Sequence, residues 1–131
     1  MKRQEIILVV EDEGSLRKAL TLKLTRHGYH VLEAENGQVG LDQALKHHPD
    51  IILLDIIMPI MDGITMFHEL RKDDWGKSAK VLILTNLSDH EKMAIATEKK
   101  SYGYLIKSDW KIEDLMKKVR ETLDHVQNNP S

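Results

Sequence analysis

Residues 51–55, Ile-Ile-Leu-Leu-Asp, form a short apolar run that ends in a carboxylate. The run does not alternate between apolar and polar side chains. This pattern is typical of a strand in a parallel sheet whose two faces are both covered by helices. The stretch therefore predicts a buried strand of an α/β domain, with Asp55 at its carboxyl end.

Four further runs of similar character predict four more strands. They span residues 6–10, 30–34, 81–84 and 104–106, and the run at 30–34 is the weakest of them. Segments with the helical spacing of apolar residues alternate with these runs. The predicted helices cover residues 16–24, 39–45, 64–70, 88–99 and 112–126, and Gly28 is the predicted stop of the first. Five alternating β-α units predict an α/β fold built on a parallel sheet.

The composition limits the classes of protein that fit. The chain has 131 residues, no cysteine and a formal net charge of −2. This length suits one domain, which we place at residues 1–126, with a polar tail at residues 127–131. The lack of cysteine excludes disulfides and thiolate metal sites and favours a reducing compartment. No charged block suggests nucleic acid, and no apolar stretch approaches the ~20 residues of a membrane span. We therefore expect a soluble, cytoplasmic protein that binds neither nucleic acid nor membrane.

Polar side chains occur where four of the predicted strands end. Glu11 and Asp12 follow the first strand, Asp55 ends the third, Thr85 follows the fourth and Lys107 follows the fifth. The carboxyl ends of parallel strands lie along one edge, and open α/β sheets bind ligands at that edge. We therefore expect three carboxylates, one hydroxyl and one ammonium group to gather in one pocket.

These residue types together indicate phosphoryl chemistry. Three carboxylates in one pocket repel each other unless a cation offsets their charge. Mg²⁺ prefers oxygen ligands and commonly bridges protein carboxylates to a phosphoryl group. A metal ion and a lysine can neutralise a transferred phosphoryl group from two sides, and Asp55 would be a nucleophile that forms an acyl phosphate. Taken singly, each residue is more often a helix cap or a solvated side chain, so the interpretation depends on all five occurring together.

The sequence at this point resembles a known family. Residues 55–63, Asp-Ile-Ile-Met-Pro-Ile-Met-Asp-Gly, are similar to the D-x-x-M-P-x-M-D-G stretch of response-regulator receiver domains, in which Gly63 permits the turn before the next helix. Residues 9–13, Thr85 and residues 104–107 extend the resemblance over nearly the whole chain. It implies a CheY-like, flavodoxin-like fold, with a doubly wound five-stranded sheet of order 2-1-3-4-5 and helices on both faces.

The resemblance implies a role for each matching residue at the metal. Asp55 would be the phosphorylated aspartate. Asp12 and Asp55 would bind Mg²⁺ directly, Glu11 would hold the ion through water, and the backbone carbonyl of Ile57 would complete the protein ligands.

The resemblance also implies how phosphorylation is read. Thr85 and Lys107 would contact the phosphoryl group. Tyr104 would turn inward as Thr85 moves toward the phosphate, which would switch the face formed by the fourth helix, the fifth strand and the fifth helix. The implied donor is a histidine kinase or a histidine phosphotransfer protein, and the switched face would act on a downstream protein target or an output domain, or form a homodimer. The protein would be a two-component or phosphorelay signalling module that catalyses its own phosphorylation, rather than an enzyme.

Four positions depart from the family pattern. Ser108 stands where the family usually has a proline in a cis peptide, and we expect a trans bond between Lys107 and Ser108. Asn86 replaces a residue that is usually small. Ile57 and Leu87 are aliphatic at two positions whose side chains help position the hydrolytic water, so we expect slow dephosphorylation.

Three alternative hypotheses fit parts of this sequence pattern. A haloacid-dehalogenase-type phosphatase needs a second aspartate two residues after the first, where this chain has Ile57. A nucleotide-binding switch needs the sequence G-x-x-x-x-G-K-[ST], which is absent. A pseudo-receiver that no longer accepts phosphate stays open because of Asn86 and Ser108.

Overall fold

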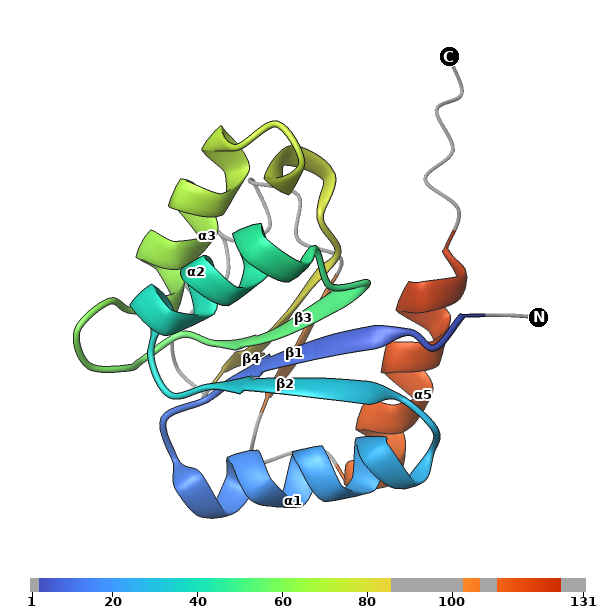
Figure 1. Ribbon diagram of the computed structural model, residues 1–131. Coiled ribbons are helices and arrows are strands. Elements are labelled where there is room, and N and C mark those ends of the chain that lie inside the picture. The colour runs from blue at the N-terminus through green and yellow to red at the C-terminus, as the bar shows by residue number, and fades with distance from the viewer. Residues whose placement is uncertain (1–2, 86–102, 107–110, 126–131) are drawn as a thin grey trace.

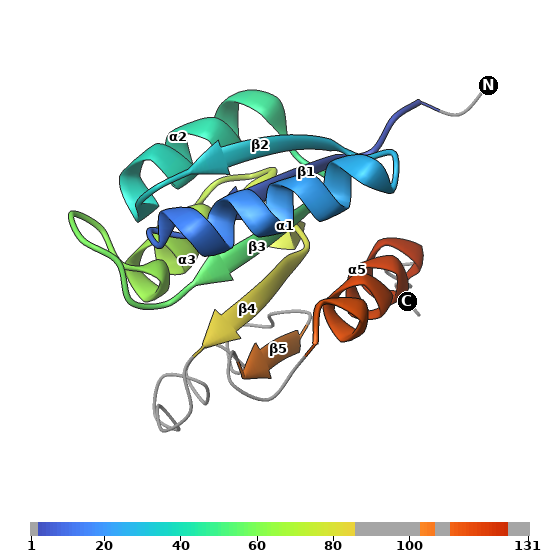
Figure 2. The same ribbon diagram turned by 90° about the horizontal axis from the view of Figure 1, so that it is seen from below.

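A parallel sheet of five strands forms the centre of the molecule. The computed structural model describes residues 3–85, 103–106 and 111–125. The strand order is β2-β1-β3-β4-β5, and every neighbouring pair is parallel (Figures 1 and 2). The strands are β1 (Ile6–Val10), β2 (His30–Ala34), β3 (Ile51–Asp55), β4 (Val81–Thr85) and β5 (Gly103–Ile106). All five predicted strands and the implied strand order are confirmed.

Helices cover both faces of the sheet, which makes three layers. Among the described residues, α1 (Gly14–Arg26) and α5 (Ile112–Asp124) lie on one face, and α2 (Gly37–His47) and α3 (Gly63–Lys72) lie on the other (Figure 1). The helix predicted over residues 88–99 lies outside the described residues. In the part of the chain that the structure describes, no helix is long and apolar enough to cross a membrane.

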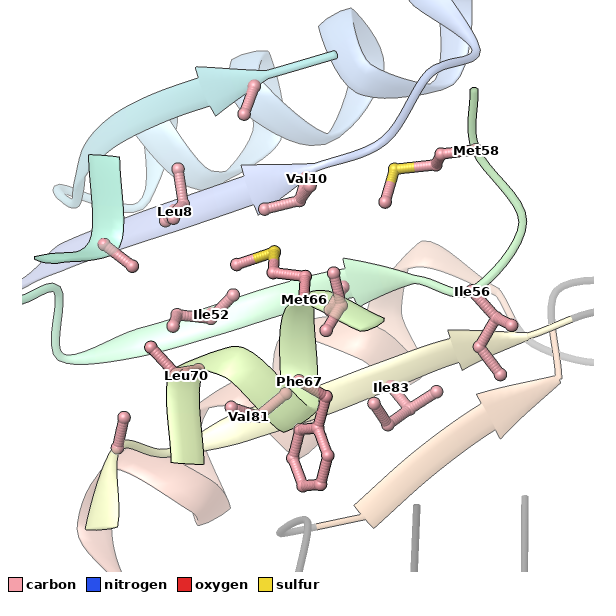
Figure 3. Close-up of a cluster of buried hydrophobic side chains, with 14 residues drawn as sticks. Leu8, Val10, Ile52, Ile56, Met58, Met66, Phe67, Leu70, Val81 and Ile83 are labelled. Atoms are coloured by element: carbon pink, nitrogen blue, oxygen red, sulfur yellow. The ribbon is translucent and has the colours of Figure 1, made fainter. Parts of the chain in front are cut away.

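Two apolar cores explain why the strand sequences show no alternation. Leu8 and Val10 of β1 face the core under α2 and α3, which Figure 3 shows. Ile7 and Val9 face the second core, under α1 and α5. All four side chains are fully buried. Because successive side chains of a strand point to opposite faces, a strand covered on both faces is apolar at every position.

The helix ends follow from local hydrogen bonds. The side chain of Asn36 accepts a hydrogen bond from the amide of Val39 and caps α2. Asp62 caps α3 in the same way through the amide of Thr65. Gly28 follows α1 with φ 94°, which confirms it as the predicted stop, because glycine adopts this left-handed conformation without a steric penalty.

Polar contacts hold α5 at the amino-terminal edge of the sheet, opposite to the edge where the strands end. Arg120 donates to both carboxylate oxygens of Glu5, each at 3.1 Å, and to the hydroxyl of Tyr29 at 3.1 Å. The hydrogen bond to Glu5 is the main cause that raises the pKa of the Arg120 guanidinium. Lys80 donates to the carbonyl of Leu123 at 3.0 Å. These contacts come from residues just before β1, β2 and β4.

Candidate functional site

Three carboxylates meet at the carboxyl edge of the sheet, as the sequence predicts. Asp55 is the last residue of β3, and Glu11 and Asp12 directly follow β1, the neighbouring strand. One carboxylate oxygen from each of the three lies within 4.8 Å of the others. Glu11 and Asp55 are buried, whereas Asp12 is exposed. The cluster therefore has a closed inner side and an open outer side.

Backbone contacts fix Glu11 at this edge. Its amide donates to the carbonyl of Ala34 at 3.0 Å, which continues the pairing of β1 with β2 by one residue. Its side-chain Oε2 accepts from the amide of Glu13 at 3.0 Å. The carboxylate is thus tied to the backbone just before α1.

Gly63 brings α3 into contact with the strand that carries Asp55. The amide of Gly63 donates to the carbonyl of Ile56 at 2.7 Å. A Cβ atom at position 63 would lie only 2.0 Å from the carbonyl oxygen of Asp55. The glycine is therefore required for a close approach. Its φ is not positive, so the close approach, rather than a left-handed turn, is what requires glycine here.

The loop after Asp55 exposes two large apolar side chains. Ile57 is 52% exposed and Ile60 is 83% exposed, whereas Met58 is buried in the core beside Val10 (Figure 3). Ile60 has φ 68°, a conformation that is strained for a β-branched residue. Ile57, two residues after Asp55, presents no polar side-chain group to solvent.

Two further predicted residues lie at or near the same edge. Thr85 is the last residue of β4, and its register partner on β5 is Ile106. Tyr104 lies within β5 opposite Ile83. Lys107, Asn86, Leu87 and Ser108 lie outside the described residues, so their predicted roles stay predictions.

The comparisons with known proteins agree with this arrangement. The family model described as "Response regulator receiver domain" matches residues 7–120. The chain belongs to the response regulator receiver domain family. The match begins at the second residue of β1, covers the other four strands and ends within α5.

Proteins similar to this chain include response regulators with different described functions. Response regulator ArlR of Staphylococcus aureus is 34% identical over 117 residues, which are 89% of this chain and 52% of ArlR. This chain thus spans about half the length of that curated relative. The structure of chemotaxis response regulator CheY4 of Vibrio cholerae matches with a TM-score of 0.84 and 28% identity, covering 92% of this chain and 99% of that one. A DNA-binding response regulator of the LuxR family from Staphylococcus aureus matches with a TM-score of 0.82 and 25% identity, covering 92% of this chain and 99% of that one.

The carboxylates of this receiver domain suit a hard divalent cation. Two unit charges 4.8 Å apart repel by about 3.5 kcal/mol at an effective dielectric constant of about 20. A cation between them removes this cost, and carboxylate oxygens are the donors that Mg²⁺ and Ca²⁺ prefer. The donor set contains neither sulfur nor imidazole, so it does not suit softer metals.

Sequence reasoning missed one residue at this site, Arg17 of α1. Its Nη1 donates to the carbonyl of Glu11 at 2.8 Å, and its Nε donates to Glu33 of β2 at 3.0 Å. The sequence offers no signal for these contacts. An arginine on the polar side of a helix gives the same sequence pattern whether it is solvated or bridges two elements.

Proposed function

We propose that this receiver domain accepts a phosphoryl group on Asp55 in an Mg²⁺-dependent reaction. The observation that carries the proposal is the convergence of Glu11, Asp12 and Asp55 to within 4.8 Å at the carboxyl edge of the sheet. Membership of the receiver family supports the same residue as acceptor. The implied donor is the phosphohistidine of a histidine kinase or of a histidine phosphotransfer protein.

In this proposal four residues hold the metal. Asp12 and Asp55 would hold it through carboxylate oxygens, Ile57 through its backbone carbonyl, and Glu11 through water. The exposure of Asp12 supports its direct role, because the open side of the cluster admits both the ion and the phosphodonor. When bound, Mg²⁺ supplies positive charge to the phosphoryl oxygens and to the attacking carboxylate.

The residues of the chain carry out the transfer. A carboxylate oxygen of Asp55 attacks phosphorus and forms the P–O bond of an acyl phosphate. The P–N bond of the donor phosphohistidine breaks, and its electron pair stays on the imidazole nitrogen. Lys107 would neutralise part of the charge on the phosphoryl oxygens, and the hydroxyl of Thr85 would donate a hydrogen bond to one of them.

Thr85 and Tyr104 would transmit the effect of phosphorylation to the output face. Thr85 ends β4, and β4 pairs directly with the strand that contains Tyr104. The proposed output face consists of the fourth helix, β5 and α5, and the fourth helix lies outside the described residues. A shift from 1:99 to 99:1 between two states needs about 5.5 kcal/mol of differential stabilisation, and charge-assisted contacts of the phosphoryl group would supply much of it.

The apolar residues near the site favour a long-lived phosphoryl group. The side chain of Ile57 is half exposed and has no group that can hydrogen-bond a hydrolytic water. Leu87 is the second aliphatic residue at a position that tunes hydrolysis in the family. We therefore propose slow self-dephosphorylation, which would accelerate in an Ile57→Asn variant.

The downstream partner is proposed from the relatives. The chain spans about half of ArlR but corresponds to nearly all of the CheY4 chain. The proposed output face would therefore act either on a separate protein or on an output domain of a longer chain. The same face could form a homodimer, and the proposal includes no direct contact of this domain with nucleic acid or membrane.

Acetyl phosphate with Mg²⁺, followed by intact-mass measurement, tests the proposal. The wild type should gain one phosphoryl group, EDTA should prevent the gain, and Asp55→Asn should abolish it. Asp62→Asn is the matched control, because Asp62 is an exposed acid of the same loop and asparagine preserves its helix cap. A folded wild type that gains no mass would support a pseudo-receiver instead.

A further inference from the structure

Arg17 links three parts of the fold around the peptide that joins Glu11 to Asp12. The residue lies in the first turns of α1, and its own amide donates to the carbonyl of Glu13 at 2.9 Å. Its guanidinium donates through Nη1 to the carbonyl of Glu11 at 2.8 Å and through Nε to Oε1 of Glu33 at 3.0 Å. One side chain thus bridges α1, the end of β1 and β2.

These contacts determine the orientation of the Glu11–Asp12 peptide. The amide of Glu11 is held by Ala34, and its carbonyl is held by Arg17. The carbonyl of Glu11 and the amide of Asp12 belong to the same planar peptide unit. Fixing that carbonyl therefore fixes the direction in which the chain enters Asp12, the exposed carboxylate of the cluster.

Only arginine can make this bridge among the basic side chains. Its planar fork donates in two directions at once, whereas a lysine ammonium is a single point charge. The Arg17 side chain is 16% exposed and that of Glu33 is 25% exposed, so both are largely enclosed. Neighbouring Lys18 also reaches Glu33, at 3.4 Å, but its side chain is 72% exposed.

We propose that Arg17 is a positioning residue for metal binding: by holding the carbonyl of Glu11, it sets Asp12 at the geometry that Mg²⁺ requires. This inference rests on the proposed function of the site. Mg²⁺ demands near-ideal octahedral geometry, so a carboxylate free to rotate away is a weaker ligand. Contacts that orient metal ligands typically change metal affinity by 10–100-fold when they are removed.

The direction of the change in Mg²⁺ affinity separates a positioning role of Arg17 from a purely electrostatic one. A cation close to a metal site repels the metal, so removal of the Arg17 charge alone would strengthen Mg²⁺ binding. Loss of positioning would weaken it. Glu33 pairs with Arg17 at 3.0 Å, and its negative charge offsets much of the guanidinium charge at the metal site. Positioning should therefore dominate.

Mg²⁺ titration of ¹⁵N-labelled protein, followed by amide chemical shifts, measures the affinity without any phosphorylation. Arg17→Met should bind Mg²⁺ about tenfold more weakly than the wild type, whereas Lys18→Met should bind with wild-type affinity. Unchanged or tighter binding by Arg17→Met would overturn the inference, as would an equal loss in Lys18→Met. If Arg17→Met does not fold, Arg17→Lys replaces it, and unchanged affinity in that variant would equally overturn the inference.

The same titration distinguishes a failure of the inference from a failure of the proposed function. Saturable shifts around Glu11, Asp12 and Asp55 in the wild type are required by the proposed function. If they occur and Arg17→Met is unaffected, only the role of Arg17 is refuted. Acetyl phosphate kinetics add a second readout: the Mg²⁺ concentration at half-maximal rate should rise about tenfold, with little change in the rate at saturating Mg²⁺.

Discussion

A methyl group at position 63 would press α3 against the strand that carries the phosphoacceptor. In the structure, a Cβ atom at Gly63 would lie 2.0 Å from the carbonyl oxygen of Asp55 and 2.9 Å from Cα of Ile56. Both contacts are with backbone, so no side-chain rotation can relieve them. Favourable contact begins near 3.5 Å, and the start of α3 must therefore move away from β3 by more than about 1 Å.

The cost of Gly63→Ala follows from these contacts. Overpacking of this kind costs about 1–3 kcal/mol, and backbone neighbours place it at the upper end of that range. The movement also stretches the hydrogen bond from Gly63 to Ile56, now 2.7 Å, whose loss costs about 1 kcal/mol. We therefore expect Gly63→Ala to lower the free energy of unfolding by about 3–4 kcal/mol.

Urea denaturation measures this difference, and Gly14→Ala is its matched control. A Cβ at Gly14 would meet nothing closer than Nη2 of Arg17 at 3.9 Å, an ordinary contact. Because alanine restricts the unfolded chain, Gly14→Ala should be neutral or more stable by up to about 1 kcal/mol. A loss below 1 kcal/mol in Gly63→Ala, or equal behaviour of the two variants, would refute the close-packing role of Gly63.

Three further predictions concern charge and strain. In EDTA, Asp12→Asn should raise the free energy of unfolding by about 1 kcal/mol, because it removes charge repulsion at an exposed position. Saturating Mg²⁺ should abolish this advantage of the variant. A variant that is less stable than the wild type in EDTA would contradict the prediction. Burial opposes ionisation of Asp50, but hydrogen bonds from Arg3 and the Ile6 amide lower its pKa overall. The ionised form therefore stabilises the fold above about pH 4 and loses this effect as the pH falls through the lowered pKa, so Asp50→Asn should be less stable at pH 7 and nearer the wild type in acid. Ile60→Asn should raise thermal stability by about 1 kcal/mol because asparagine tolerates positive φ, and a destabilised variant would show that this φ carries no strain.

The strands could be predicted from the sequence because burial on both faces leaves a direct signature. Each predicted strand appears in the structure, and β3 and β4 each include the polar residue that ends the run. Backbone pairing does not depend on side-chain polarity, so Asp55 and Thr85 belong to the ladder although they are not apolar. The strand order came from the family resemblance, because apolar runs carry no information about which strands are neighbours.

The site could be predicted only in part. Glu11, Asp12 and Asp55 converge because the carboxyl ends of parallel strands share an edge, and this rule needs no knowledge of side-chain contacts. The roles of Arg17 and Gly63 depend on distances across elements. A contact between a helix and the end of a strand leaves no local pattern in the sequence. The roles of Arg17 and Gly63 are therefore evident only in the three-dimensional structure.

Reductive trapping identifies the phosphorylated residue directly. Borohydride converts a phosphorylated aspartate to homoserine, whereas a free carboxylate does not react. After treatment with acetyl phosphate and Mg²⁺, peptide mass spectrometry should find homoserine at position 55 and nowhere else, and EDTA should abolish it. Homoserine at Asp12 or Asp62 instead, or equal yield at position 55 without the metal, would contradict the claim that the three clustered carboxylates form a magnesium-dependent phosphoacceptor site.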